Sequence, residues 1–134
     1  MDYIVMDLEW NQNPYGKSNY HPDMPFEIIE IGAVRVSEDR EILDSYQQVI
    51  YPRVYKKLHY KIQEITHFTN EELSHGKDFR RAIVEFLDWC GDDYMFCTWG
   101  SMDLTELQKN MRHYKLERVL DFPLFYVDLQ KMFS

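Results

Sequence analysis

The stretch Tyr3-Ile4-Val5-Met6-Asp7-Leu8-Glu9-Trp10 organises the rest of the chain, because an apolar run meets two acidic residues there. A short apolar run closed by polar residues is typical of a buried strand. Side chains alternate between the two faces of a strand, so Asp7 and Glu9 point the same way, about 7 Å apart. Two such carboxylates repel each other and need hydrogen-bond donors or a cation nearby. Hard oxygen ligands at this spacing suit Mg²⁺ or Mn²⁺.

Length and composition predict one globular domain spanning residues 1–134. Hydrophobic residues make up 45% of the chain, which is enough for a core. No apolar run approaches the roughly 20 residues of a membrane span, and Met1-Asp2-Tyr3 lacks the basic region of a secretory signal. Cys90 and Cys97 have no metal-type spacing, so we expect buried free thiols in a reducing cytoplasm.

The net charge of −8 argues against a general polyanion-binding surface. It does not exclude an enzyme acting on nucleic acid, because an acidic site can meet phosphate through a bound divalent metal. The charge does predict weak nucleic-acid binding without metal and little non-specific affinity for duplex.

The first half of the chain predicts a three-stranded meander. After the opening strand, residues 11–25 are rich in Asn, Pro, Gly, Ser and Tyr and read as a loop. Residues 26–36 and 42–50 are strand-like runs joined by a polar turn at 37–41, which favours a hairpin. Glu27 and Glu30 could be drawn into a metal site. We favour a structural role for both, because the neighbouring isoleucines suffice to make a half-buried strand.

Residues 53–63 form the most basic stretch of this acidic chain, with aromatic residues interleaved. Such a combination can stack bases and contact phosphates. A solvated surface segment is nevertheless the favoured interpretation. Thr69 with Glu72 then forms a capping box, which starts a short helix that ends before Gly76.

The second half predicts alternating helices and strands. The expected elements are a helix over 78–90, a strand over 94–99, a helix over 103–114 with Ser101 as its N-cap, a strand over 124–127 and a helix starting at 128. The resulting order, β-β-β-α-α-β-α-β-α, predicts a mixed sheet with helices on its faces and ligands at its strand ends.

Asp103 has two interpretations. An acid in the first turn of a helix complements the helix dipole and needs no further role. If the strand before it lies beside the first strand, however, Asp103 approaches Asp7 and Glu9 at one edge of the sheet. Three carboxylates from two segments could then hold one or two divalent ions.

The order and spacing of several motifs resemble the DEDD (DnaQ-like) 3′–5′ exonuclease superfamily, and most closely its ERI-1/KapD-like branch. The match covers essentially the whole chain. The segments that carry it are Tyr3–Trp10, Glu27–Val34, Ile65–Leu73, Thr98–Asp103 and Val127–Leu129.

This resemblance implies an α/β, RNase H-like fold, with a mixed five-stranded sheet and helices on both faces. It implies that Asp7, Glu9 and Asp103 are catalytic ligands of a two-metal Mg²⁺ or Mn²⁺ site. The activity would release nucleoside 5′-monophosphates from the 3′ end of RNA or single-stranded DNA. Leu8 and Trp10 would contact the terminal nucleotide, although Trp10 could equally be a packing aromatic at the sheet edge.

The chain departs from the family in its third motif, which pairs a general-base His or Tyr with an Asp five or four residues later. His113 and Tyr114 are followed at those distances by Arg118, and His75 by Arg80. The C-terminal helices that carry this motif are therefore missing. The domain is a fragment of a longer exonuclease (the interpretation we favour), a degenerate protein, or one completed by a partner chain.

Each of these explanations leaves an apolar sheet face uncovered, which predicts marginal stability or a homo-oligomer formed through that face. As it stands, the 134-residue chain is expected to be inactive or weak. The alternative function is a non-catalytic nucleic-acid-binding or regulatory module on the same fold. A weaker third option is a structural domain whose acids are surface charge.

Overall fold

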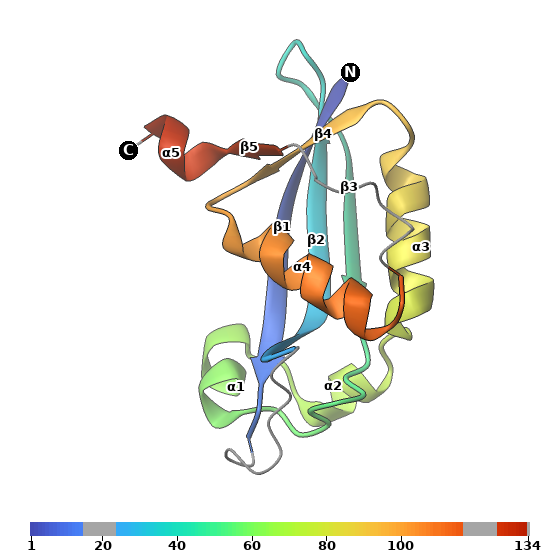
Figure 1. Cartoon of the computed structure of the whole chain (residues 1–134), viewed down its shortest axis with the longest axis vertical. Coiled ribbons are helices and arrows are strands. Elements are labelled where there is room, and N and C mark those ends of the chain that lie inside the picture. Colours follow the sequence, from blue (N-terminus) through green and yellow to red (C-terminus); the bar gives the residue numbers. More distant parts are fainter. Residues whose placement is uncertain (15–23, 117–125, 134) are drawn as a thin grey trace.

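The computed structural model describes residues 1–14, 24–116 and 126–133, which form one sheet flanked by helices (Figure 1). The elements are β1 (Asp2–Gln12), β2 (Phe26–Val36), β3 (Ile42–Val49), α1 (Tyr60–Thr66), α2 (Asn70–Ser74), α3 (Phe79–Cys90), β4 (Tyr94–Thr98), α4 (Met102–His113), β5 (Tyr126–Asp128) and α5 (Leu129–Phe133).

The sheet is mixed and has the strand order β3-β2-β1-β4-β5. The antiparallel pairs β1–β2 and β2–β3 confirm the predicted meander. β4 runs parallel to β1, and β5 runs parallel to β4. The first strand is therefore central, with the meander on one side and the helix-connected strands on the other. This arrangement confirms the predicted five-stranded α/β fold.

Alternation along β1 sends Ile4, Met6 and Leu8 into the main core, while Asp7 lies on the opposite face and is exposed. The helices that cover this core are α3 and α4. Their buried contributions are Phe79, Ala82, Ile83, Phe86, Cys90, Leu104, Leu107 and Met111. These residues fall at helical spacing, as the sequence predicts.

A smaller cluster of Ile29, Leu58 and Leu73 lies at one end of the sheet. Val49 packs against it, and Val49 shares its side of β3 with Ser45 and Gln47. The chain around α1 and α2 therefore covers the face opposite α3 and α4 at this end, which places helices on both faces.

The order of elements differs from the expectation by one helix, α1, within a region predicted only as a basic surface segment. The expectation missed α1 because the helix buries no residue and so carries no apolar stripe. Its N-cap is His59, whose Nδ1 accepts the Lys61 N–H at 3.2 Å. His is not among the preferred capping residues.

The two predicted N-caps have different outcomes. Thr69 caps α2 as predicted, because its hydroxyl accepts the Glu72 N–H at 3.1 Å. Ser101 occupies the N-cap position of α4, but its side chain makes no capping hydrogen bond and its backbone is helical. The predicted N-cap position is therefore confirmed, but the side-chain hydrogen bond typical of a serine cap is not formed. The Ser101 carbonyl instead accepts both the N–H and the hydroxyl of Thr105.

The remaining predictions concern boundaries and cysteines. β1 continues through Gln12, into the segment predicted as a loop, and residues 15–23 of that loop lie outside the described residues. The last strand is described only from Tyr126, since 124 and 125 also lie outside them. Cys90 and Cys97 are buried free thiols, as predicted. In the described parts of the chain, no helix is long and apolar enough to cross a membrane.

Candidate active site

The candidate site lies on β1 just beyond the point where its pairing with β4 ends. β4 pairs with β1 only from Asp2 opposite Tyr94 to Val5 opposite Cys97. The chain then turns through Gly100, at a φ of 81° that suits glycine, and enters α4. Further along β1, the Leu8 N–H donates instead to Asp103 Oδ2 at 3.2 Å. A helix-borne carboxylate thus reaches the central strand between Asp7 and Glu9.

Asp128 fixes the turn that delivers Asp103. Its Oδ1 accepts the Gly100 N–H at 3.1 Å and the Lys131 N–H at 3.2 Å. The Thr98 hydroxyl donates to the Gly100 carbonyl at 2.6 Å. The carboxylate thus ties the turn before α4 to the start of α5, and the Thr98 bond ties the end of β4 to the same turn.

Asn110 fixes the other end of α4 and is completely buried. Its Oδ1 accepts the Ile28 N–H at 3.0 Å, and its Nδ2 donates to the Phe26 carbonyl at 2.9 Å. The same Nδ2 lies 2.8 Å from the Glu106 carbonyl. The Asn110 amide thus pairs with the backbone N–H and C=O groups of β2 as a neighbouring strand would. These bonds fix the position of α4 against the sheet.

Burial and like charge both act on the site carboxylates. Burial, followed by the charge of Asp7, raises the pKa of Asp103 to about 6, against the opposing effect of the Leu8 hydrogen bond. Burial is also the largest cause of the raised pKa of Glu9, followed by the charges of Asp7, Glu30 and Asp103. Among the described ion pairs, none joins a Lys or Arg to any of these four acids. The cluster therefore carries negative charge that the described side chains leave uncompensated.

Glu27 and Glu30 have different surroundings, although both lie on β2. Glu27 is buried and accepts three backbone N–H groups, which confirms its structural interpretation. Glu30 pairs directly with Glu9 across the strands, and Gln47 Nε2 donates to it at 3.0 Å. From the sequence, a structural role was favoured for Glu30 over a place in a metal site. The register of β2 against β1, which the sequence does not specify, brings it to the site.

A divalent metal fits the donor set of this cluster, which offers carboxylate oxygens and neither thiolate nor imidazole. The side chains do not already form a ligand shell. Within the described residues, no three acidic, His or Cys side chains lie close enough together to hold a metal as they stand. The structure thus brings Asp7, Glu9 and Asp103 into electrostatic contact, without converging them on one point.

The two predicted nucleotide contacts have different exposure. The Leu8 side chain is 4% exposed and belongs to the core, so only its backbone reaches the site. Trp10 is half-buried, and its ring centroid lies 5.7 Å from that of Phe26. Trp10 thus packs at the edge of the core while keeping part of its ring exposed. That these residues contact a nucleotide stays a prediction.

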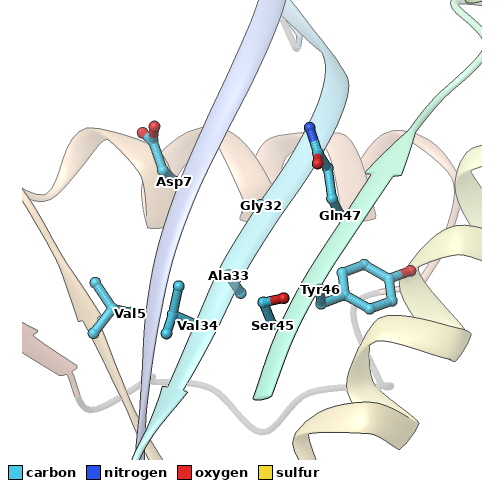
Figure 2. A pocket seen from close by; sticks show the side chains of 8 residues that line it. All are labelled: Val5, Asp7, Gly32, Ala33, Val34, Ser45, Tyr46 and Gln47. Carbon is cyan, nitrogen blue, oxygen red and sulfur yellow. The ribbon is translucent and has the colours of Figure 1, made fainter. Parts of the chain in front are cut away.

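An open hollow of about 390 Å³ lies on the sheet face away from α4, and Asp7 lies at its rim (Figure 2). It spans the three strands of the meander. The lining residues are Val5, Asp7, Gly32, Ala33, Val34, Ser45, Tyr46 and Gln47. The most exposed acid of the site thus borders an open hollow on this face of the sheet.

Comparison with known proteins decides the family. The exonuclease family (RNase_T) matches residues 4–132. The chain belongs to this exonuclease family. This agrees with the exonuclease resemblance of the sequence motifs. Two relatives are PolC-type DNA polymerases III, from Staphylococcus haemolyticus (31% identical over 102 residues) and Staphylococcus saprophyticus (28% over 111). They align with 76% and 83% of this chain, which spans only 6% and 7% of their length.

Solved structures show the same fold. The nuclease domain of 3′hExo, a DEDDh family member bound to rAMP, superposes with a TM-score of 0.79 at 22% identity, over 98% of this chain and 68% of that one. Cell-death related nuclease 4 also gives 0.79, at 19% identity, over 98% and 46%. E. coli exonuclease I in complex with a 5cy-dA13 oligonucleotide gives 0.68, at 12% identity, over 98% and 29%.

Proposed function

We propose that this chain is a metal-dependent 3′–5′ exonuclease domain of the ERI-1/KapD-like branch. It hydrolyses phosphodiesters at the 3′ end of RNA or single-stranded DNA and releases nucleoside 5′-monophosphates. The observation that carries the proposal is the hydrogen bond from the Leu8 N–H to Asp103, which brings a distant carboxylate to Asp7 and Glu9. Membership of the exonuclease family supports the reaction class.

In this proposal Asp7, Glu9 and Asp103 hold Mg²⁺ or Mn²⁺. The metal would supply an activated water and neutralise charge on the phosphate and on the leaving 3′-oxygen. The protein's own residues set the position of these ligands: the Leu8 N–H orients Asp103, while the register of β1 orients Asp7 and Glu9. The partly exposed ring of Trp10 would contact the terminal nucleotide beside Leu8.

A second candidate function, a non-catalytic nucleic-acid-binding module, is favoured by one observation. None of the His or Tyr positions tested above places an Asp at the spacing of the family's third motif, so a general base is missing. General acid–base catalysis typically contributes about 10²–10⁴-fold to rate. The expected activity of the 134-residue chain is accordingly weak or nil, and a longer chain or a partner would supply the base.

Two labels on one oligonucleotide test the direction of attack. With Mn²⁺, a 5′-labelled single strand should shorten from its 3′ end one nucleotide at a time, slowly with the 134-residue chain and faster with a longer chain that carries the base, and a 3′ label should be released as a monophosphate. Asp7→Asn should abolish the reaction, while Asp39→Asn, an exposed acid in the β2–β3 turn, should leave it intact. Internal cleavage products would contradict the proposal. Binding without any shortening would favour the second candidate.

Two further predictions accompany this proposal. The domain is cytoplasmic, and two copies associate through the sheet face around Val5 and Val34. Light scattering across a concentration series tests the association. A dimer that dissociates in Val34→Lys is the expected result, and a monomer at all concentrations would contradict it.

A further inference from the structure

A cluster of exposed lysines follows β3 in the sequence, although the chain as a whole carries a net charge of −8. Residues 53–63 contain no acidic residue. Lys56, Lys57 and Lys61 are exposed, and none forms an ion pair with another described residue. Arg53 differs, because it pairs with Asp78 at 2.8 Å. The three lysines therefore present a local positive surface against the overall charge.

Glu27 holds the start of this segment in a fixed shape. Its buried carboxylate accepts the N–H groups of Arg53, Val54 and Tyr55 at 2.8, 2.9 and 2.7 Å. Three charge-assisted bonds to consecutive residues leave this backbone little freedom. The lysines that follow therefore extend from an ordered loop.

Asn11 holds the next part of the segment and is also completely buried. Its Nδ2 donates to the carbonyls of Tyr55 and Lys57 at 3.0 and 2.9 Å, and its Oδ1 accepts the His59 N–H at 2.9 Å. Asn11 lies two residues beyond Glu9 on β1, which is about 7 Å along a strand. The segment is therefore anchored directly beside the carboxylate site, where Figure 1 shows α1 next to the end of β1.

An exposed aromatic ring lies among these lysines. Tyr60 is 64% exposed, and its ring stacks on His59 with a centroid separation of 4.7 Å. The Lys61 ammonium lies 6.0 Å from the Tyr60 ring centroid. A large apolar ring in this position gains nothing from the core, yet it offers a flat surface on which a base can stack.

We propose that Lys56, Lys57, Tyr60 and Lys61, here called the basic platform, bind single-stranded nucleic acid leading to the carboxylate site. The lysines contact successive phosphates, and Tyr60 stacks on a base. The inference rests on the proposed function, because it assumes that a 3′ end reaches Asp7, Glu9 and Asp103. An acidic peptide would satisfy the lysines but would leave the exposed ring without a partner.

Salt-dependent binding tests the platform. Fluorescence anisotropy of a 5′-fluorescein-labelled oligo(U) or oligo(dT) is measured in metal-free buffer, so that no cleavage occurs. Each phosphate contact contributes about 0.7 to the slope of log K against log salt. The triple variant Lys56→Gln/Lys57→Gln/Lys61→Gln should therefore lower that slope by about 2. Tyr60→Ala should weaken binding about 5- to 100-fold with little change in slope.

The matched control is Arg80→Gln, an exposed cation on α3 without an ion pair among the described residues. It should leave both affinity and slope unchanged, and circular dichroism should show every variant folded. Three results would overturn the platform: wild-type chain that binds no oligonucleotide, a triple variant with wild-type slope, or displacement of the oligonucleotide by poly-aspartate at equal charge concentration.

The platform and the nuclease assignment can fail separately. If Asp7→Asn stops Mn²⁺-dependent shortening while the triple variant binds normally, the platform is wrong and the proposed function stands. If the triple variant loses binding while Asp7→Asn and Asp103→Asn both bind Mn²⁺ with wild-type affinity, the platform stands and the nuclease assignment is wrong.

Discussion

At the scale of single residues, Asp103 connects the fold to the proposed chemistry. It accepts the Leu8 N–H, is partly buried, and lies within the electrostatic field of Asp7. A carboxylate placed only to complement a helix dipole would not need this strand contact. The bond explains why a helix-borne acid reaches the middle of β1.

Asp103→Asn separates the charge of this residue from its hydrogen bond. The amide oxygen can still accept the Leu8 N–H, so the fold should survive, but the charge that binds metal is gone. We expect Mn²⁺-dependent degradation to fall at least about tenfold, since even outer-shell changes at metal sites cost about 10–100-fold. Degradation is measured on a labelled single strand, and wild-type rates in a folded Asp103→Asn protein would contradict the ligand role.

The raised pKa of Asp103 predicts the pH dependence of stability. In the metal-free protein the native state holds this proton up to a pKa of about 6, above the unfolded value of about 3.9. The native state therefore binds more protons between these values, and the contribution of Asp103 to the free energy of unfolding falls as pH rises through this window.

Asp103→Asn should accordingly gain stability relative to wild type between pH 4 and pH 7, by of order 1 kcal/mol once solvent screening is allowed for. Urea denaturation at several pH values measures the difference. Mn²⁺ should stabilise the wild type more at pH 7 than at pH 5, because protons compete for the carboxylates. A difference independent of pH would contradict the assigned pKa.

At the scale of elements, two buried asparagine side chains form hydrogen bonds with backbone groups that no neighbouring strand pairs. Asn110 bonds β2 beyond the end of β3, and Asn11 bonds the loop before α1. Sequence periodicity does not reveal such contacts, because each depends on a partner more than 40 residues away. Asn11 even fell within a segment predicted as a loop. The helices α3 and α4, by contrast, follow from the local spacing of apolar residues, and the sequence predicts both of them.

Asn110→Ala should destabilise the protein by about 2–4 kcal/mol, because it leaves the Ile28 N–H and the Phe26 carbonyl buried without partners. It should also lower activity, since α4 carries Asp103. The control Arg112→Ala changes an exposed side chain on the same helix and should stay within about 0.5 kcal/mol of wild type. Equal stability of the two variants in urea denaturation would show that the amide does not fix α4.

At the scale of the whole molecule, the distribution of charge decides what the domain can bind. The net charge of −8 opposes polyanions, and the segment after β3 offers four cations in eleven residues without an acid between them. The fold class follows from the sequence, because strand alternation and helical periodicity are local patterns. Alternation also predicts that Asp7 and Glu9 share a face, whereas Asp103 was named through the order of motifs in the family resemblance and its contact with Leu8 spans 95 residues. The position of Glu30 and the existence of α1 do not, since they depend on strand register and on contacts across the sheet.

This charge distribution predicts that nucleic-acid affinity depends both on bound metal and on whether the nucleic acid is single- or double-stranded. Mn²⁺ should raise affinity for a nuclease-resistant single strand, because it neutralises the carboxylate cluster, while blunt duplex should bind weakly with or without metal. Anisotropy titrations at fixed ionic strength compare the four conditions. Tight metal-independent binding of duplex would contradict the assignment of the binding surface.

Mn²⁺ titration followed by electron paramagnetic resonance shows whether Asp7, Glu9 and Asp103 act as one cation site. We expect saturable Mn²⁺ binding by the wild type, weakened at least about tenfold by Asp7→Asn and by Asp103→Asn alike, and unchanged in Asp39→Asn. Wild-type Mn²⁺ affinity in both Asp7→Asn and Asp103→Asn would contradict this shared site.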